Sequence, residues 1–81
     1  MPAEYILYST SACHLCEQAE EIIQLVSHDL SINWIKTDIV DDALLLAQYG
    51  LSIPVLKCLA NSEELRWPFN EDALRTFIHR Q

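Results

Sequence analysis

The sequence predicts an α/β fold with the element order βαβαββα, in which three helices pack on a four-stranded mixed sheet. Three observations lead to this prediction. A short apolar run near the N-terminus is followed at once by a segment with apolar residues at helical spacing, and this alternation then recurs. Two more short strands and a last amphipathic segment complete the chain. Its 81 residues predict one small domain spanning residues 1–81.

The first strand and the first helix have the clearest patterns. Residues 5–8 form an apolar run bounded by serine and threonine, which is typical of a buried central strand. Residues 14–28 place apolar side chains on one helical face and glutamate and glutamine on the other. The sequence therefore predicts a central strand followed by an amphipathic helix.

The second strand is predicted at residues 31–37, which are rich in β-forming side chains. A strand, a helix and a second strand in succession favour a right-handed crossover between two parallel strands. Asn33 and Lys36 indicate that this strand lies at an edge of the sheet.

The second helix is predicted at residues 43–49. Asp41 and Asp42 precede it, and Gly50, the only glycine in the chain, follows it as a C-cap. We expect the leucines of this segment, Leu44 to Leu46, to belong to the core.

The last third of the chain predicts a β-hairpin, residues 53–59 and 64–67, and then a helix. Pro54 stands at the start of the hairpin, where it removes no ladder N–H, and Pro68 ends it. Asn70 offers an N-cap oxygen to the final helix. That helix has an apolar stripe made of Ala73, Leu74, Phe77 and Ile78.

Two cysteines three residues apart, Cys13 and Cys16, stand where the first strand gives way to the first helix. The N–H groups and the dipole at a helix start stabilise a thiolate and lower its pKa from about 8.5. We expect Cys13 to be the exposed nucleophile. Cys16 lies one helical turn further on, where it can resolve a disulfide formed on Cys13. The spacing therefore predicts dithiol redox chemistry.

Charge and cysteine content limit the partners and the cellular compartment to be expected. The net charge of −7 opposes binding to nucleic acid or to an anionic membrane. Residues 1–4 contain neither the basic segment nor the apolar run of a signal peptide. Three cysteines are too few for a disulfide framework, which favours a reducing compartment. We therefore expect a cytoplasmic protein without nucleic-acid or membrane partners.

The chain resembles the thioredoxin fold in its minimal, glutaredoxin-like form. The resemblance is carried by Cys13-His14-Leu15-Cys16, by Ile53-Pro54 before the third strand and by the βαβαββα order. The resemblance covers essentially the whole chain. Tyr49-Gly50, Ile53-Pro54-Val55-Leu56 and Trp67-Pro68-Phe69 are similar to a group of small bacterial glutaredoxin-like proteins of poorly defined role.

The resemblance implies a cis Ile53–Pro54 bond that faces the cysteine pair, so that the Ile53 backbone can pair with an extended thiol substrate. Ser52 keeps a hydroxyl in this loop. His14, Leu15 and Trp67 complete the expected substrate-binding residues, and Phe69 is expected in the core or lining the site.

Three features of ordinary glutaredoxins are weak or missing. His14 and Leu15 replace a Pro-Tyr pair, no basic residue stands among residues 9–12, and Trp67-Pro68-Phe69 takes the place of a Gly-Gly turn. We therefore expect no tightly bound cofactor, with glutathione acting at most as a weakly bound reductant and a protein reductant as the alternative.

The remaining cysteine and histidines have structural interpretations beside functional ones. A protonated His14 would stabilise the Cys13 thiolate, although a helix start disfavours a cation. Cys58 is expected to be a buried apolar residue, the alternative being a third redox thiol. His28 and His79 sit at helix ends and suggest no ligand set.

The sequence predicts a monomeric thiol–disulfide oxidoreductase that acts on a disulfide-containing protein or a small thiol and is reset by an unidentified reductant. Two alternatives stay open. One is a thioredoxin-fold interaction domain that has lost turnover. The other is a metal-binding module, for which no second pair of close cysteines or histidines accompanies Cys13 and Cys16, so we expect no metal.

Overall fold

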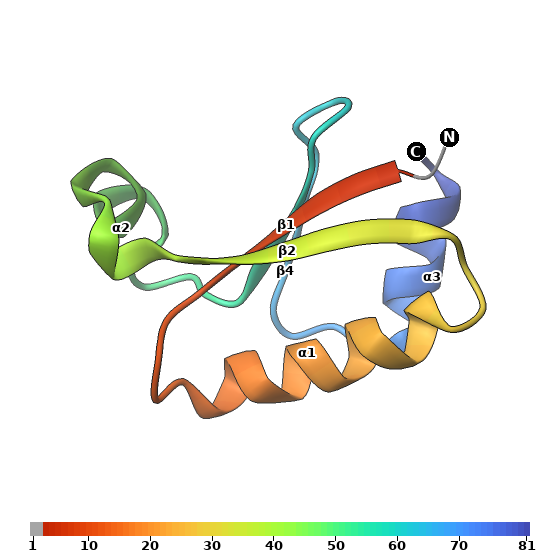
Figure 1. The fold of residues 1–81 in the computed structure, drawn as a ribbon, viewed down its shortest axis with the longest axis horizontal. Helices are drawn as coiled ribbons and strands as arrows, with labels where there is room; N and C mark the ends of the chain where they lie inside the picture. The colour runs from red at the N-terminus through yellow and green to blue at the C-terminus, as the bar shows by residue number, and fades with distance from the viewer. Residues whose placement is uncertain (1–2) are drawn as a thin grey trace.

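The computed structural model describes residues 3–81, and its elements follow the predicted βαβαββα order (Figure 1). Met1 and Pro2, on which the expectation of no signal peptide partly rests, lie outside the described residues. A short 3-10 turn that the sequence did not reveal, η1, separates β2 from α2. The elements are β1 (Ala3–Ser9), α1 (His14–Ser27), β2 (Ile32–Asp38), η1 (Ile39–Asp41), α2 (Ala43–Tyr49), β3 (Val55–Cys58), β4 (Glu64–Arg66) and α3 (Glu71–His79).

The four strands form one mixed sheet in the order β2-β1-β3-β4. β1 runs parallel to β2 and antiparallel to β3, and β3 pairs antiparallel with β4. The predicted mixed sheet and the edge position of β2 are confirmed. The register places Ser9 beside Asp38 and Tyr8 beside Val55, and it therefore aligns the ends of β1 and β2 with the start of β3.

The core is divided between the two faces of the sheet, because successive side chains of a strand point to opposite sides. Tyr5 and Leu7 pack beneath α1 and α3 in the larger cluster, which also contains Ile23, Leu74 and Phe77. A smaller cluster on the other face consists of Tyr8, Ile39, Tyr49 and Val55. Figure 1 shows α1 and α3 on one side of the sheet and α2 apart from them, at the far end of β2.

The expectation that Leu44 to Leu46 belong to the core is wrong for two of the three leucines. Leu44 is 80% exposed and Leu46 is also exposed, while Leu45 is half-buried. α2 has only two turns, so helical spacing brings just Leu45 and Tyr49, four residues apart, onto the sheet. Tyr49 is the only buried residue of α2.

Polar side chains cap the starts of α2 and α3. The side chain of Asp42 accepts hydrogen bonds from the N–H groups of Leu44 and Leu45, and Asn70 accepts one from Ala73 at 2.8 Å. Gly50 is the C-cap of α2, as predicted, but its φ of −53° is right-handed. A Cβ at this position would lie 2.5 Å from the Leu46 carbonyl oxygen, so close approach, not a left-handed turn, requires glycine there.

Candidate functional site

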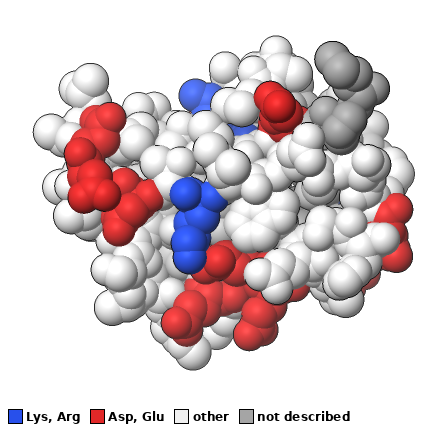
Figure 2. Space-filling model, in the orientation of Figure 1, with Lys and Arg blue, Asp and Glu red and all other residues white. Residues whose placement is uncertain are grey.

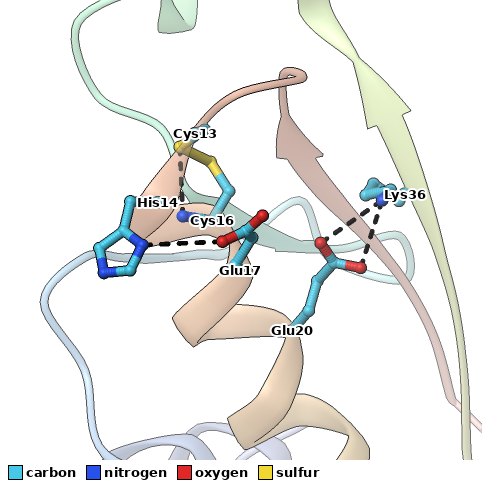
Figure 3. Close-up of a disulfide and its surroundings, with 6 residues drawn as sticks. All are labelled: Cys13, His14, Cys16, Glu17, Glu20 and Lys36. Atoms are coloured by element: carbon cyan, nitrogen blue, oxygen red, sulfur yellow. Dashed lines mark hydrogen bonds and ion pairs between the residues drawn. A yellow bond between two sulfur atoms is a disulfide. The ribbon is translucent and has the colours of Figure 1, made fainter.

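The cysteine pair lies at the junction of β1 and α1, where Cys13 is the N-cap residue of the helix. Cys13 and Cys16 are joined by a disulfide (Figure 3). Ala12 has a positive φ of 59°, and this uncommon conformation turns the chain from the loop into the helix. The end of a strand, one left-handed residue and a helix start thus fix the position of both sulfur atoms.

The two sulfur atoms have different surroundings. Cys13 is half-buried, whereas Cys16 is only 2% exposed and packs inside the first turn of α1. The N–H of Cys16 donates a hydrogen bond to the Sγ of Cys13 at 3.1 Å. In the reduced protein such a donor stabilises a thiolate on Cys13 more than on Cys16. This arrangement suits attack through Cys13 followed by resolution through Cys16.

The two residues between the cysteines both face solvent. The side chain of His14 is 82% exposed, and its Nδ1 lies 3.6 Å from the Glu17 carboxylate. Figure 3 shows the imidazole turned toward Glu17 and away from the disulfide. Leu15 is exposed as well. An incoming partner would meet Leu15 on the surface of the first helical turn.

The predicted residues around Pro54 lie at the same end of the sheet as the cysteine pair. Because Tyr8 pairs with Val55, the next step of the register places Ser9 beside Pro54. The N–H of Trp67 donates to the carbonyl of Pro54 at 3.2 Å, which adds the end of β4 to this group. The end of β1, the start of β3 and the end of β4 therefore lie at one end of the sheet, from which residues 10–12 lead to the cysteine pair.

The Ile53–Pro54 bond is cis, as predicted, and Pro54 is buried while Ser52 and Ile53 are half-buried. The Trp67–Pro68 bond is also cis, which the sequence did not reveal. The N–H of Ile53 donates to the Tyr49 carbonyl at 3.2 Å. The Ile53 N–H, one of the two backbone groups of Ile53 that could pair with a substrate, is therefore already hydrogen-bonded within the chain.

Trp67 is half-buried and makes an edge-to-face contact with Phe69, with ring centroids 5.1 Å apart. Phe69 belongs to the larger core cluster. Cys58 is a free, buried cysteine of the same cluster, as its interpretation as an apolar residue predicts.

Two charged residues near the site were not predicted to belong to it. Lys36 and Asp38 line a small cavity of about 180 Å³ together with Ser9, Thr10 and Ser11. The ammonium of Lys36 lies 3.3 Å from the carboxylate of Glu20 on α1 (Figure 3). The parallel register could have revealed both residues, because it aligns the end of β2 with the end of β1.

Acidic side chains gather on the visible face over α1 and over α2, with few basic side chains between them (Figure 2). Within residues 3–81, no group of three or more histidine, cysteine, aspartate or glutamate side chains is placed to hold a metal ion. None of the helices in this range is long and apolar enough to cross a membrane.

A hydrogen-bonded network that the sequence did not reveal lies on the face of the sheet that α2 covers. The Tyr49 hydroxyl donates to the Glu64 carboxylate, and Gln48 donates to the Tyr49 hydroxyl at 3.3 Å. Arg66 donates to the other Glu64 oxygen at 3.0 Å. The Tyr49 ring stacks on Tyr8 with centroids 4.4 Å apart. This network connects α2 to β1 and β4.

The network shifts the acidity of both of its central groups. Burial, together with the hydrogen bond to Glu64 and the charge of that carboxylate, raises the pKa of Tyr49 to about 12. Burial acts to raise the pKa of Glu64, but hydrogen bonds from Tyr49 and Arg66 and the Arg66 charge outweigh it and lower that pKa. Tyr49 therefore stays a neutral donor and Glu64 a charged acceptor at neutral pH.

The free energy of unfolding is expected to fall at alkaline pH through Tyr49. An unfolded tyrosine loses its proton near pH 10, whereas folded Tyr49 keeps its proton to about pH 12. The stabilisation is therefore present below pH 10 and is lost as the pH rises toward 12. In urea unfolding, the advantage of the wild type over Tyr49→Phe should shrink by about 1 kcal/mol between pH 8 and pH 11. An advantage that stays constant over this range would contradict the assignment.

Comparisons with known proteins agree with this fold. The family model described as Glutaredoxin-like domain (DUF836) matches residues 4–79. The X-ray structure of protein XcR50 from X. campestris is 35% identical in sequence, covers 95% of this chain and 97% of its own, and has a TM-score of 0.85. No curated protein matches the sequence significantly.

Two more distant structures bear on the fold alone. The solution NMR structure of protein Ne2328 from Nitrosomonas europaea is 20% identical, with a TM-score of 0.83, and the match covers 96% of this chain and 93% of that one. A mutant thioredoxin from Halobacterium salinarum is 22% identical, with a TM-score of 0.77 and coverage of 96% and 73%. The fold is thioredoxin-like, as predicted.

Proposed function

The chain belongs to the Glutaredoxin-like domain (DUF836) family, and we propose that it is a thiol–disulfide oxidoreductase in which Cys13 attacks and Cys16 resolves. The observation that carries the proposal is the cysteine pair at the N-terminus of α1. There the sulfur of the half-buried Cys13 accepts a hydrogen bond from the backbone N–H of Cys16, which is almost fully buried. A low thiolate pKa and access to solvent are what an attacking cysteine needs.

The reaction has two exchange steps. The Cys13 thiolate attacks one sulfur of a substrate disulfide, that disulfide breaks, and the first substrate thiolate leaves. The Cys16 thiolate then attacks the Cys13 sulfur of the mixed disulfide and releases the second substrate thiolate. Two electrons and two protons have then passed to the substrate, and the protein holds the Cys13–Cys16 disulfide. A thiol or dithiol reductant resets it.

The surroundings of the pair favour a disulfide-containing protein or peptide as the substrate. Leu15 is exposed beside the disulfide. The basic side chains at this end of the sheet, Lys36 and Arg66, are already paired with Glu20 and Glu64. An acidic thiol such as glutathione therefore meets little positive charge here, and it acts as a weak reductant and not as a tightly bound cofactor. The protein works as a monomer in the cytoplasm, where reductants keep thiols reduced.

The function can be tested with a peptide disulfide that joins a fluorophore to a quencher. The reduced protein should release the fluorophore and become oxidised at Cys13 and Cys16, as mass spectrometry of alkylated protein would show. The variant Cys58→Ala is the matched control, because it removes a cysteine that is free and buried, and it should react like the wild type. A fully reduced protein that leaves both the peptide disulfide and glutathione disulfide unchanged would rule the function out and favour an interaction domain.

A further inference from the structure

The segment that leads into Pro54 packs on the sheet through Tyr49 and, less deeply, through Leu45 and Ile53. α2 and the five residues after it lead into β3, and Tyr49 is the only buried residue of α2. Leu44 and Leu46 on its other sides are exposed and add no packing. Figure 1 shows α2 at one end of the molecule, away from α1 and α3. The position of this helix therefore depends mainly on the contacts of Tyr49.

Tyr49 has contacts at both of its ends. Its carbonyl accepts the N–H groups of Ser52 at 2.8 Å and Ile53 at 3.2 Å, which sets the path of the chain into Pro54. Its side chain is 1% exposed, stacks on Tyr8 and donates its hydroxyl to Glu64. One residue thus connects the substrate-binding segment of residues 52–54 to β1 at the centre of the sheet and to β4 at its edge.

Glu64 is held in place as an acceptor. Its second oxygen accepts a hydrogen bond from Arg66 two residues further along β4, so Tyr49 and Arg66 each bind one oxygen of the same carboxylate. A hydrogen bond to a charged acceptor is stronger than one between neutral groups. If it were lost, Glu64 would remain paired with Arg66, whereas the end of α2 would keep only ring stacking and apolar contact.

We propose that Tyr49 is a positioning residue of the redox site, and that its hydroxyl bond to Glu64 holds residues 52–54 in register with the Cys13–Cys16 pair for an extended disulfide substrate. This inference rests on the proposed function. A peptide substrate must align along Ile53 and Pro54, whereas a small disulfide needs only to reach Cys13. The bond between Tyr49 and Glu64 therefore acts on substrate choice and not on the exchange chemistry.

The substitution Tyr49→Phe keeps the ring that stacks on Tyr8 and removes only the hydroxyl. It should raise the KM for the fluorophore–quencher peptide disulfide by about fivefold, a factor that the loss of one hydrogen bond is large enough to supply. The rate with 2-hydroxyethyl disulfide should not change. Glu64→Gln keeps an acceptor oxygen but removes its charge, so it should raise this KM by less than Tyr49→Phe does. Glu63→Gln alters the neighbouring carboxylate, which pairs with Arg80, and should have no effect.

Amide hydrogen exchange tests the positioning role apart from activity. In Tyr49→Phe, the amides of Ser52 and Ile53 should exchange about fivefold faster, whereas the amide of Leu74, bonded to Asn70 in α3, should not change. Unchanged exchange at Ser52 and Ile53 would overturn the inference, as would equal rises in KM for the peptide and the small disulfide. A wild-type protein that is inactive with both disulfides would contradict the proposed function. The amide exchange rates of Ser52 and Ile53 would still decide whether Tyr49 holds residues 52–54 in place.

Discussion

Cys16→Ser is expected to accumulate a mixed disulfide with the fluorophore–quencher peptide, whereas Cys13→Ser should form none. Serine at position 16 cannot attack the bond between Cys13 and the substrate, so the first exchange step occurs and the second does not. Serine at position 13 removes the more accessible cysteine of the pair, because Cys13 is half-buried whereas Cys16 is 2% exposed. Non-reducing mass spectrometry would measure both species.

The experiment has a control within the chain. Carrying Cys58→Ala in both variants removes the free third cysteine, so that any adduct must form at position 13 or 16. Equal trapping by the two variants would contradict the division of roles between attacking and resolving cysteine. Trapping by Cys13→Ser alone would reverse that division.

Leu74→Ala should destabilise the protein by about 2–5 kcal/mol, whereas Leu44→Ala should change its stability by no more than about 0.5 kcal/mol. Both leucines are helical and both changes remove the same atoms. Leu74 is fully buried beneath the sheet, so its loss leaves a cavity, whereas Leu44 is 80% exposed and leaves none. Small domains are stable by only about 5–15 kcal/mol, so the first change is a large fraction of the total.

Urea unfolding of the oxidised protein would measure both changes through the midpoint at an unchanged slope. A similar loss of stability in the two variants would mean that α2 is covered in solution. That result would contradict the exposure of its outer side and would favour association through Leu44. Light scattering at several concentrations would then show a dimer.

The elements that the sequence predicted well are those with strong local patterns. The central strand and α1 were found because burial imposes a continuous apolar run on one and a 3.6-residue period on the other. The cap at Asn70 was found because its side-chain oxygen satisfies an N–H group only three residues away. Such interactions are local, so neighbouring letters of the sequence contain them.

The prediction was wrong where a helix is too short to show which way it faces. A run of three leucines in α2 has no clear period, and seven residues cannot distinguish a buried face from an exposed one. The structural role of Tyr49 was missed for a different reason. Its hydroxyl partner, Glu64, lies 15 residues away on a strand whose place in the sheet follows from long-range pairing.

The sequence alone determined the order of the elements, the location of the cysteine pair at a helix start and the chemistry of two thiols one turn apart. These depend on contacts within a few residues. Only the tertiary structure decided which charges approach the pair, how deeply Cys16 is buried and what fixes the loop before Pro54. Those features arise when strand pairing brings distant segments together at one end of the sheet, and this pairing cannot be read from the spacing of residues in the sequence.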